Sequence, residues 1–255
     1  MSALIADRFS SGRAFLAGDA AHTLPPARGG YGANTGIEDF FNLAWKLAAV
    51  LSGSSKPELL NTYDAERRPI AWLRHNQIFA RPDYAAVAND EEKKVPIIED
   101  DAMELGQLYR STAVLGAGVD LPPAMRPDQW AGQPGTRAPH LWVSKSGTSF
   151  STLDLLQRDW VLLTEDERWC AAAATTSERL KLKLHSSRIG GDLMPPTASA
   201  PDLDTFRREF RSAFGIGPEA ASLIRPDGYV AWRSTELPAD PAAAFADALA
   251  RVASV

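Results

Sequence analysis

Apolar residues recur at helical spacing in the first third of the chain. The repeat of three and four residues predicts a helix with one buried face, formed by Ile37, Phe40, Phe41, Ala44, Leu47, Ala48 and Leu51. Thr35 and Glu38 have the spacing of a capping box at the start of this helix. Gly53 follows the last apolar position, where a helix commonly ends. A short apolar strand over residues 14–17 is expected to precede the helix.

A second helix is predicted from about Pro57 to about His75. Pro69 lies inside this segment. Proline lacks a backbone donor and clashes with the preceding helical turn, so a kink or a restart is expected there. The segment that follows is less regular, and Pro122-Pro123 and the glycines from Gly132 to Gly135 are typical of a linker.

The last part of the chain alternates strand and helix patterns. Strands are predicted at 160–164, in the alternation of Leu180, Leu182 and Leu184 with lysines, and in a hairpin formed by 221–224 and 229–232 around Pro226-Asp227-Gly228. Helical spacing links Leu203, Phe206, Phe210 and Phe214. Asp240 and Pro241 begin a last helix, with Phe245, Leu249 and Val252 facing inward. We interpret Trp130, Trp142, Trp160 and Trp232 as core residues.

These patterns divide the chain into three parts. Residues 1–82 hold the first strand and the two helices, 83–135 are helical or irregular, and 136–255 form a small α/β domain. The sequence therefore predicts an α/β protein with a domain boundary near residue 135.

Composition narrows the function. A formal net charge of −5 gives no electrostatic case for binding nucleic acid or an anionic membrane. The single cysteine, Cys170, excludes an internal disulfide, a dithiol redox pair and a cysteine-rich zinc site. No apolar run is long enough for a membrane span, and residues 1–8 lack the layout of a signal peptide. A reducing, cytoplasmic setting is expected.

The candidate chemistry lies between residues 13 and 47. A strand leads to Asp19, whose carboxylate can only accept hydrogen bonds, as from polyol hydroxyls. Gly29, Gly30 and Gly32 follow and let the backbone approach a flat ligand closely. A helix N-terminus near Thr35 favours an electron-rich edge or a developing anion, as in a reduced flavin. The same strand, loop and helix also occur in α/β proteins that bind no ligand.

The stretch Gly18-Asp19-Ala20-Ala21-His22 and its loop resemble the second FAD motif of the class A flavoprotein monooxygenases. The resemblance implies that Gly18 and Asp19 contact the ribityl chain of FAD. It also implies that Pro26 and the backbone of Gly29, Gly30, Gly32, Ala33 and Asn34 lie beside the isoalloxazine ring. No catalytic residue is assigned, because in this family the cofactor performs the chemistry, and His22 is expected to be structural.

Residues 63–69 are similar to the helix that follows this loop in the family, and a structural role is expected for them. Later segments are similar to the branch of phenol hydroxylases and aromatic polyketide hydroxylases: 108–114, 135–140, 151–155 and 225–233. The resemblance implies the C-terminal part of an FAD-binding, para-hydroxybenzoate hydroxylase-like domain, followed by a thioredoxin-like α/β domain. It implies hydroxylation of a phenolic or aromatic polyketide substrate through a flavin hydroperoxide, with NAD(P)H as the transient reductant.

The chain departs from that family in what it lacks. It has no G-x-G-x-x-G turn for the FAD pyrophosphate, no mid-chain Asp-Gly motif and no counterpart of the substrate-covering sheet. It therefore resembles the C-terminal half of such an enzyme and is not expected to be active alone. The strand at 14–17 and the helix face at Phe40 and Phe41 are expected to be exposed unless an N-terminal partner half or self-association covers them.

Two other functions compete with the hydroxylase. One is a non-catalytic scaffold or dimerisation module that retains the thioredoxin-like domain, favoured by the missing dinucleotide fold. The other is a redox-independent enzyme, such as a cyclase or an isomerase, for which the sequence offers no positive feature.

Overall fold

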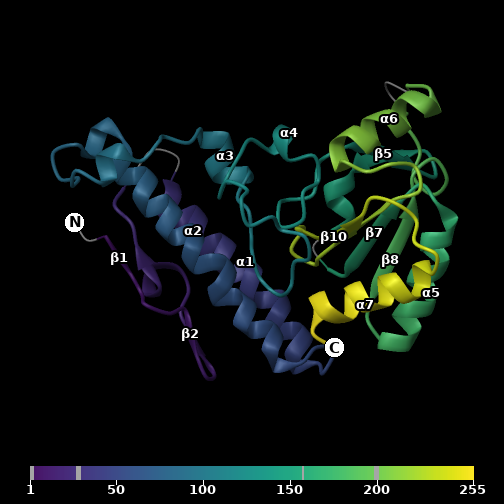
Figure 1. The fold of residues 1–255 in the computed structure, drawn as a ribbon, viewed down its shortest axis with the longest axis horizontal. Coiled ribbons are helices and arrows are strands. Elements are labelled where there is room, and N and C mark those ends of the chain that lie inside the picture. Colours follow the sequence, from purple (N-terminus) through teal and green to yellow (C-terminus); the bar gives the residue numbers. More distant parts are fainter. Residues whose placement is uncertain (1–2, 27–29, 157, 198–200) are drawn as a thin grey trace.

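The computed structural model describes residues 3–26, 30–156, 158–197 and 201–255. Two long helices lie at one end of the molecule and a sheet with its covering helices at the other, joined by irregular chain (Figure 1). Gly29 falls in none of these ranges, so the prediction for that glycine lies outside the described residues.

Short strands and two helices make up the N-terminal region. Strand β1 (Leu4–Ile5) pairs with β4 (His22–Thr23), and β2 (Ser10–Ser11) pairs with β3 (Ala14–Phe15), both antiparallel. The predicted strand at 14–17 is therefore the second arm of a small hairpin. A 3-10 turn, η1 (Gly18–Ala20), follows, then α1 (Tyr31–Leu51), η3 (Pro57–Leu60) and α2 (Asn61–Ala80).

The predicted start of the first helix is wrong. Helix α1 begins at Tyr31, and its N-cap is Gly30 in the left-handed region (φ 66°), with no side-chain cap. Thr35 lies inside the helix, where its hydroxyl donates to the Tyr31 carbonyl at 2.5 Å, so it forms no capping box. Helix α2 also continues through Pro69 without the restart that the sequence suggested.

The buried face of α1 is polar, which corrects the face predicted from its apolar residues. Its buried polar side chains recur at helical spacing: Thr35, Asp39, Asn42 and Lys46. The apolar side chains of Ile37, Phe40 and Phe41 are 67%, 61% and 47% exposed. This polar stripe faces inward because α2 supplies Arg67 and Glu66 as charged partners for Asp39 and Lys46. Asp227, much later in the chain, accepts from Asn42. The exposure expected for Phe40 and Phe41 is confirmed.

The middle of the chain has little regular structure. It contains η4 (Pro82–Tyr84), η5 (Glu92–Lys94), α3 (Asp100–Leu105) and α4 (Pro127–Trp130). Trp130 is buried, and its indole Nε1 donates to the Gly106 carbonyl at 2.7 Å. A Cβ on Gly106 would lie 1.8 Å from the Met125 carbonyl oxygen, so this close backbone crossing requires glycine.

The C-terminal region is built on a four-stranded sheet in the order β10-β9-β7-β8. Strand β7 (Trp160–Thr164) is parallel to β8 (Leu184–Arg188) and antiparallel to β9 (Ala221–Ile224), which is antiparallel to β10 (Val230–Ser234). Helices α5 (Glu167–Leu180) and α7 (Pro241–Ala253) pack on one face, and α6 (Leu203–Phe214) packs on the other. This order and layering are those of a thioredoxin-like α/β domain. A separate hairpin joins β5 (Trp142–Lys145) and β6 (Thr148–Ser151).

Most predicted elements of this domain are confirmed, with two corrections. The β9–β10 hairpin, α6 and α7 are confirmed, and Asp240 caps α7 by accepting from Ala243 N at 2.9 Å. The alternation of Leu180, Leu182 and Leu184 is not one strand, because α5 ends at Leu180, Lys181 is left-handed (φ 54°) and β8 begins only at Leu184. Trp142 is 58% exposed, so it is no core residue.

Candidate functional site

The Gly18–Asp19 turn rests on α1. Gly18 is buried with φ +58°, and a Cβ on Gly36 of α1 would lie 3.1 Å from the Gly18 Cα. The Gly18 N–H donates to Asp39 Oδ2 at 3.1 Å. Asp19 itself is exposed. An accessible carboxylate is therefore carried on a backbone that is fixed against the helix.

Asp39 is the centre of the bonds that hold this turn. His22 Nε2 donates to Asp39 Oδ2 at 2.7 Å, and Arg67 Nε of α2 donates to Asp39 Oδ1 at 2.8 Å. Burial alone would raise the pKa of Asp39, but the His22 hydrogen bond and the Arg67 charge outweigh it and lower that pKa. His22 is thus a buried partner of Asp39, in agreement with the structural role predicted for it.

The first turn of α1 offers backbone donors. Its N-cap, Gly30, provides no side-chain cap, and Gly30 and Ala33 are exposed while Gly32 is half-buried. The first N–H groups of a helix have no partner within it and carry partial positive charge. Asn34 Nδ2 donates to Glu104 Oε2 of α3 at 3.1 Å, which ties the first turn to the middle of the chain. An electron-rich ligand edge would meet donors here.

Tyr31 anchors the same turn. Its hydroxyl donates to Asp100 Oδ1 of α3 at 3.0 Å, and its carbonyl accepts from Arg74 Nη1 of α2 at 3.1 Å. Burial and the Asp100 hydrogen bond raise the pKa of Tyr31, which keeps the phenol protonated as a donor. The predicted ring-side residue Pro26 is exposed, and its carbonyl accepts from the Tyr84 hydroxyl.

The structure brings most predicted site residues to one end of α1. The turn at Gly18 and Asp19 lies against its second turn at Gly36, and Gly30, Gly32, Ala33 and Asn34 form or flank its first turn. Sequence reasoning gave the segment 63–69, which contains Arg67, a structural role, but it missed Asp39 and the bond between the two residues. The polar repeat of Thr35, Asp39, Asn42 and Lys46 was a readable signal for them, hidden by the apolar repeat on the same helix.

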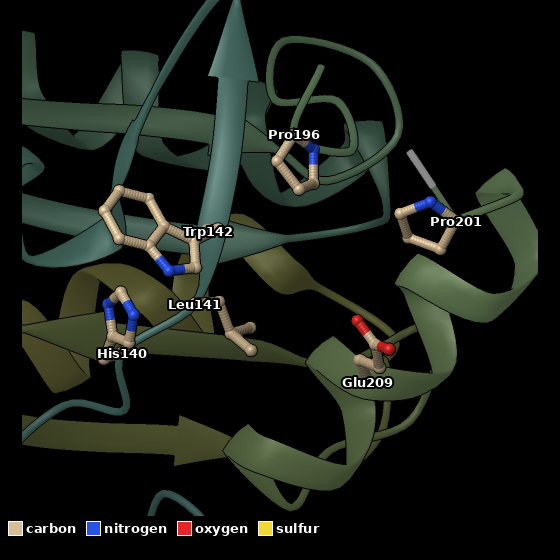
Figure 2. Close-up of a pocket in the computed structure, with 6 residues that line it drawn as sticks. All are labelled: His140, Leu141, Trp142, Pro196, Pro201 and Glu209. Atoms are coloured by element: carbon tan, nitrogen blue, oxygen red, sulfur yellow. The ribbon is translucent and has the colours of Figure 1, made fainter. Parts of the chain in front are cut away.

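The thioredoxin-like domain has a separate shallow pocket of about 290 Å³, lined by His140, Leu141, Trp142, Pro196, Pro201 and Glu209 (Figure 2). His140 Nδ1 lies 2.7 Å from Ser151 Oγ. None of the residues that line this pocket belongs to α1 or to the Gly18–Asp19 turn.

Cys170 is half-buried, and burial raises the pKa of its thiol, so Cys170 does not present a reactive thiolate.

No cluster of His, Cys, Asp or Glu side chains in the described part of the chain could hold a metal ion. No helix among those residues combines the length and apolarity needed to cross a bilayer.

Two family models match the chain. Residues 1–77 match an FAD binding domain, and residues 131–254 match the C-terminal domain of aromatic-ring hydroxylases. The chain is 42% identical to a 4-methyl-5-nitrocatechol 5-monooxygenase of Burkholderia sp, over 98% of the chain and 45% of that protein. It is 40% identical to a tetracenomycin A2 monooxygenase-dioxygenase of Streptomyces glaucescens, over 99% of the chain and 43% of that protein.

Solved structures give the same picture. An aklavinone-11 hydroxylase, crystallised with FAD and aklavinone, superposes with a TM-score of 0.87 at 38% identity, over 100% of the chain and 46% of that protein. The rebeccamycin biosynthetic enzyme RebC with reduced flavin superposes with a TM-score of 0.72 at 31% identity, over 98% of the chain and 47% of that protein. The chain thus spans about half the length of the relatives it matches.

Proposed function

Because the chain belongs to the family of FAD-dependent aromatic-ring hydroxylases, we propose that it supplies the ribityl and ring side of an FAD site in an aromatic monooxygenase. The observation that carries this proposal is the exposed Asp19 carboxylate, held on the buried Gly18 beside the uncapped first turn of α1. Within the proposal, Gly18 and Asp19 meet the ribityl chain. Pro26, Gly29, Gly30, Gly32, Ala33 and Asn34 flank the isoalloxazine ring.

The residues at this site fit such a cofactor. Ribityl hydroxyls are donors that a carboxylate can accept, and the pyrimidine edge of a flavin is electron-rich, which suits helix N–H groups. When bound and reduced by NAD(P)H, FAD would provide the electrons that activate O₂, of which one oxygen atom enters the aromatic substrate and the other leaves as water. The chain's own contribution is to bind the ribityl chain, to orient the ring and to place fixed donors at its edge. We assign it no catalytic side chain.

The substrate class follows from the relatives. The two curated proteins described above act, by their names, on a nitrocatechol and on a tetracenomycin, and the crystallised hydroxylase was bound to aklavinone. We therefore propose a phenolic or aromatic polyketide substrate. Because a single cysteine allows no internal disulfide, we also propose a cytoplasmic setting. We further propose that residues 1–82 form the C-terminal part of an FAD-binding domain, that residues 83–135 link it to the rest of the chain, and that residues 136–255 form the thioredoxin-like domain.

A purely non-catalytic scaffold is not favoured, because relatives that match almost the whole chain are monooxygenases.

A partner for the N-terminal region is part of the proposal. The relatives are about twice as long as the chain, and α1 exposes Ile37, Phe40 and Phe41. A polypeptide that carries the dinucleotide-binding half, or a second copy of this chain, would bury that apolar face.

Replacing Asp19 tests the cofactor site. We expect the chain to bind FAD saturably at micromolar concentrations, and this binding should quench the fluorescence of the flavin. Asp19→Ala should weaken that binding by about 10- to 100-fold, since hydrogen bonds to a charged group are worth about 1.5–3 kcal/mol. Asp247→Ala, on the distant and exposed side of α7, is the matched control and should change nothing. Equal affinity in the Asp19→Ala variant, or no binding by a folded chain at about millimolar FAD, would refute the proposal. We call the proposed ribityl and ring side of the FAD site the half-site.

Removing the apolar face tests the partner. Sedimentation velocity of the chain is expected to show concentration-dependent self-association, and Phe40→Ser combined with Phe41→Ser should shift the distribution to monomer. Val119→Ser, at another exposed apolar residue (84%), should leave the distribution as it was. A wild-type chain that sediments as a monomer at all concentrations would count against the need for a covering partner.

A further inference from the structure

The turn between β9 and β10 extends from the thioredoxin-like sheet to the two N-terminal helices. Arg225 begins this turn and is fully buried. Its Nη1 and Nη2 donate to the two carboxylate oxygens of Glu66 on α2, at 2.6 and 2.9 Å. Its Nε donates to Asp227 Oδ1 of the same turn at 2.9 Å, and Asp227 also accepts from Asn42 Nδ2 of α1 at 3.4 Å. The hairpin is therefore bonded to both helices.

Glu66 of α2 also accepts hydrogen bonds from α1 and from the middle of the chain. Besides Arg225, its carboxylate accepts from Lys46 Nζ of α1 at 2.8 Å, from Asn42 Nδ2 at 2.7 Å and from Ser111 Oγ at 2.6 Å. Glu66, Lys46 and Arg225 are all buried. Buried charges persist only with partners in good geometry, so each member of this cluster restricts the position of the others.

The next residue of α2 continues the connection to the candidate site. Arg67 donates to Asp39 Oδ1 at 2.8 Å and to the Thr35 carbonyl at 3.1 Å, both on α1. Asp39 in turn holds the Gly18 N–H. Two consecutive residues of α2 thus connect Arg225, in the C-terminal domain, to the turn that presents Asp19.

We infer that Arg225 is a positioning residue for the cofactor half-site, through which the thioredoxin-like domain sets the place of α1 and of the Gly18–Asp19 turn. Each residue of a helix adds 1.5 Å and 100°. A shift of α1 by one residue would therefore break every bond of its polar stripe. Ile37 and Phe40 are exposed, so the position of α1 within this chain depends on its polar stripe together with Leu43, which packs with Phe9 and Tyr63.

The position requires arginine rather than a cation in general. The guanidinium carbon of Arg225 lies 5.4 Å from the Trp45 ring centroid, 5.7 Å from Tyr109 and 5.8 Å from Tyr229. These rings fix the plane of a group that must donate two parallel bonds to Glu66. Lysine keeps the charge but has no planar fork.

The test is amide hydrogen exchange of the whole chain carrying Arg225→Lys. We expect the amides of residues 18–23 and 31–46 to exchange about 10-fold faster or more, while those of β7 keep their wild-type rates. Arg233→Lys is the matched control. Arg233 lies on β10 and donates to the Ala131 carbonyl at 2.8 Å, so its variant should leave 18–23 and 31–46 unchanged. Unchanged rates at 18–23 in Arg225→Lys, or an equal increase throughout the chain, would overturn the inference. If that variant does not fold, Asp227→Asn is measured in its place.

A double-variant cycle separates positioning from general stability. If Arg225 acts through Asp39, Arg225→Lys and Asp39→Asn should be non-additive in the exchange rate of residues 18–23, whereas additive effects would contradict the connection. The inference rests on the proposed function for its last readout, a weakening of FAD binding by about 5- to 10-fold in Arg225→Lys. A chain that binds no FAD would refute the proposed function, while the exchange rates would still decide the role of Arg225.

Discussion

Glu66→Ala is expected to lower the free energy of unfolding by about 3–5 kcal/mol, the usual cost of removing one partner from a buried ion cluster. The variant leaves Arg225 and Lys46 buried with Asp227 as the nearest remaining carboxylate. Burial lowers the pKa of Lys46 to about 8, in spite of the opposing charge of Glu66. Without Glu66 its ammonium would lose the largest favourable charge. Urea unfolding followed by circular dichroism measures the change.

Two comparisons make that result specific. Glu66→Gln keeps the shape of the side chain and can accept one of the hydrogen bonds, so its loss should be smaller than that of the alanine variant. Glu58→Ala, at an exposed glutamate of η3, should change the free energy of unfolding by less than about 0.5 kcal/mol. If Glu66→Ala behaved like Glu58→Ala, the cluster would contribute nothing to the stability of the chain.

Phe210→Ala is expected to cost about 3–5 kcal/mol, because it empties a site in the core between α6 and the sheet. Phe210 is fully buried and its ring lies 4.8 Å from that of Phe214, centroid to centroid. Val161 and Ile224 of the sheet belong to the same buried cluster. The rigid sheet limits how far the surroundings can collapse into the cavity. Thermal or urea unfolding gives the loss.

Phe40→Ala is the matched comparison, a phenylalanine on a helix at the same kind of spacing. Phe40 is 61% exposed within one chain, so at a protein concentration at which the chain is monomeric its loss should leave the free energy of unfolding nearly unchanged, and it should raise solubility. Comparable destabilisation by the two variants would mean that the face of α1 at Phe40 is covered in solution.

These two phenylalanines also show how far the sequence could predict the fold. Helical spacing identified both helices, because the repeat follows from backbone geometry. It could not tell which face is buried, since that depends on what lies opposite. The partners of the polar stripe on α1, Glu66 and Arg225, stand far along the chain. Leu180 was misassigned for a related reason: it packs with the same core as Leu182 and Leu184, but from the end of a helix.

The candidate site was predictable where its chemistry is local. Asp19 and the glycines after it form a contiguous string, so the motif could be recognised without a structure. Asp39 was not singled out, and Arg67 was noted only within the segment 63–69, because each is an ordinary charged residue of a helix until its partner is known. Their bond joins positions 28 residues apart, and that of Arg225 to Glu66 joins positions 159 apart.

That last separation has a consequence for synthesis on the ribosome. The N-terminal helices emerge long before the hairpin that binds them, and at 5–20 residues per second the 159 residues from Arg67 to Arg225 take roughly 8–32 s to make. During this interval Glu66 can pair with Lys46 but not with Arg225. Helix α1 then presents an apolar face and a polar face that lacks part of its hydrogen-bond partners. Native contacts between distant positions form late. The half-site at the start of the chain is therefore completed only when the C-terminal domain has been made, and the nascent chain is most open to aggregation, or to capture by a chaperone, before that point.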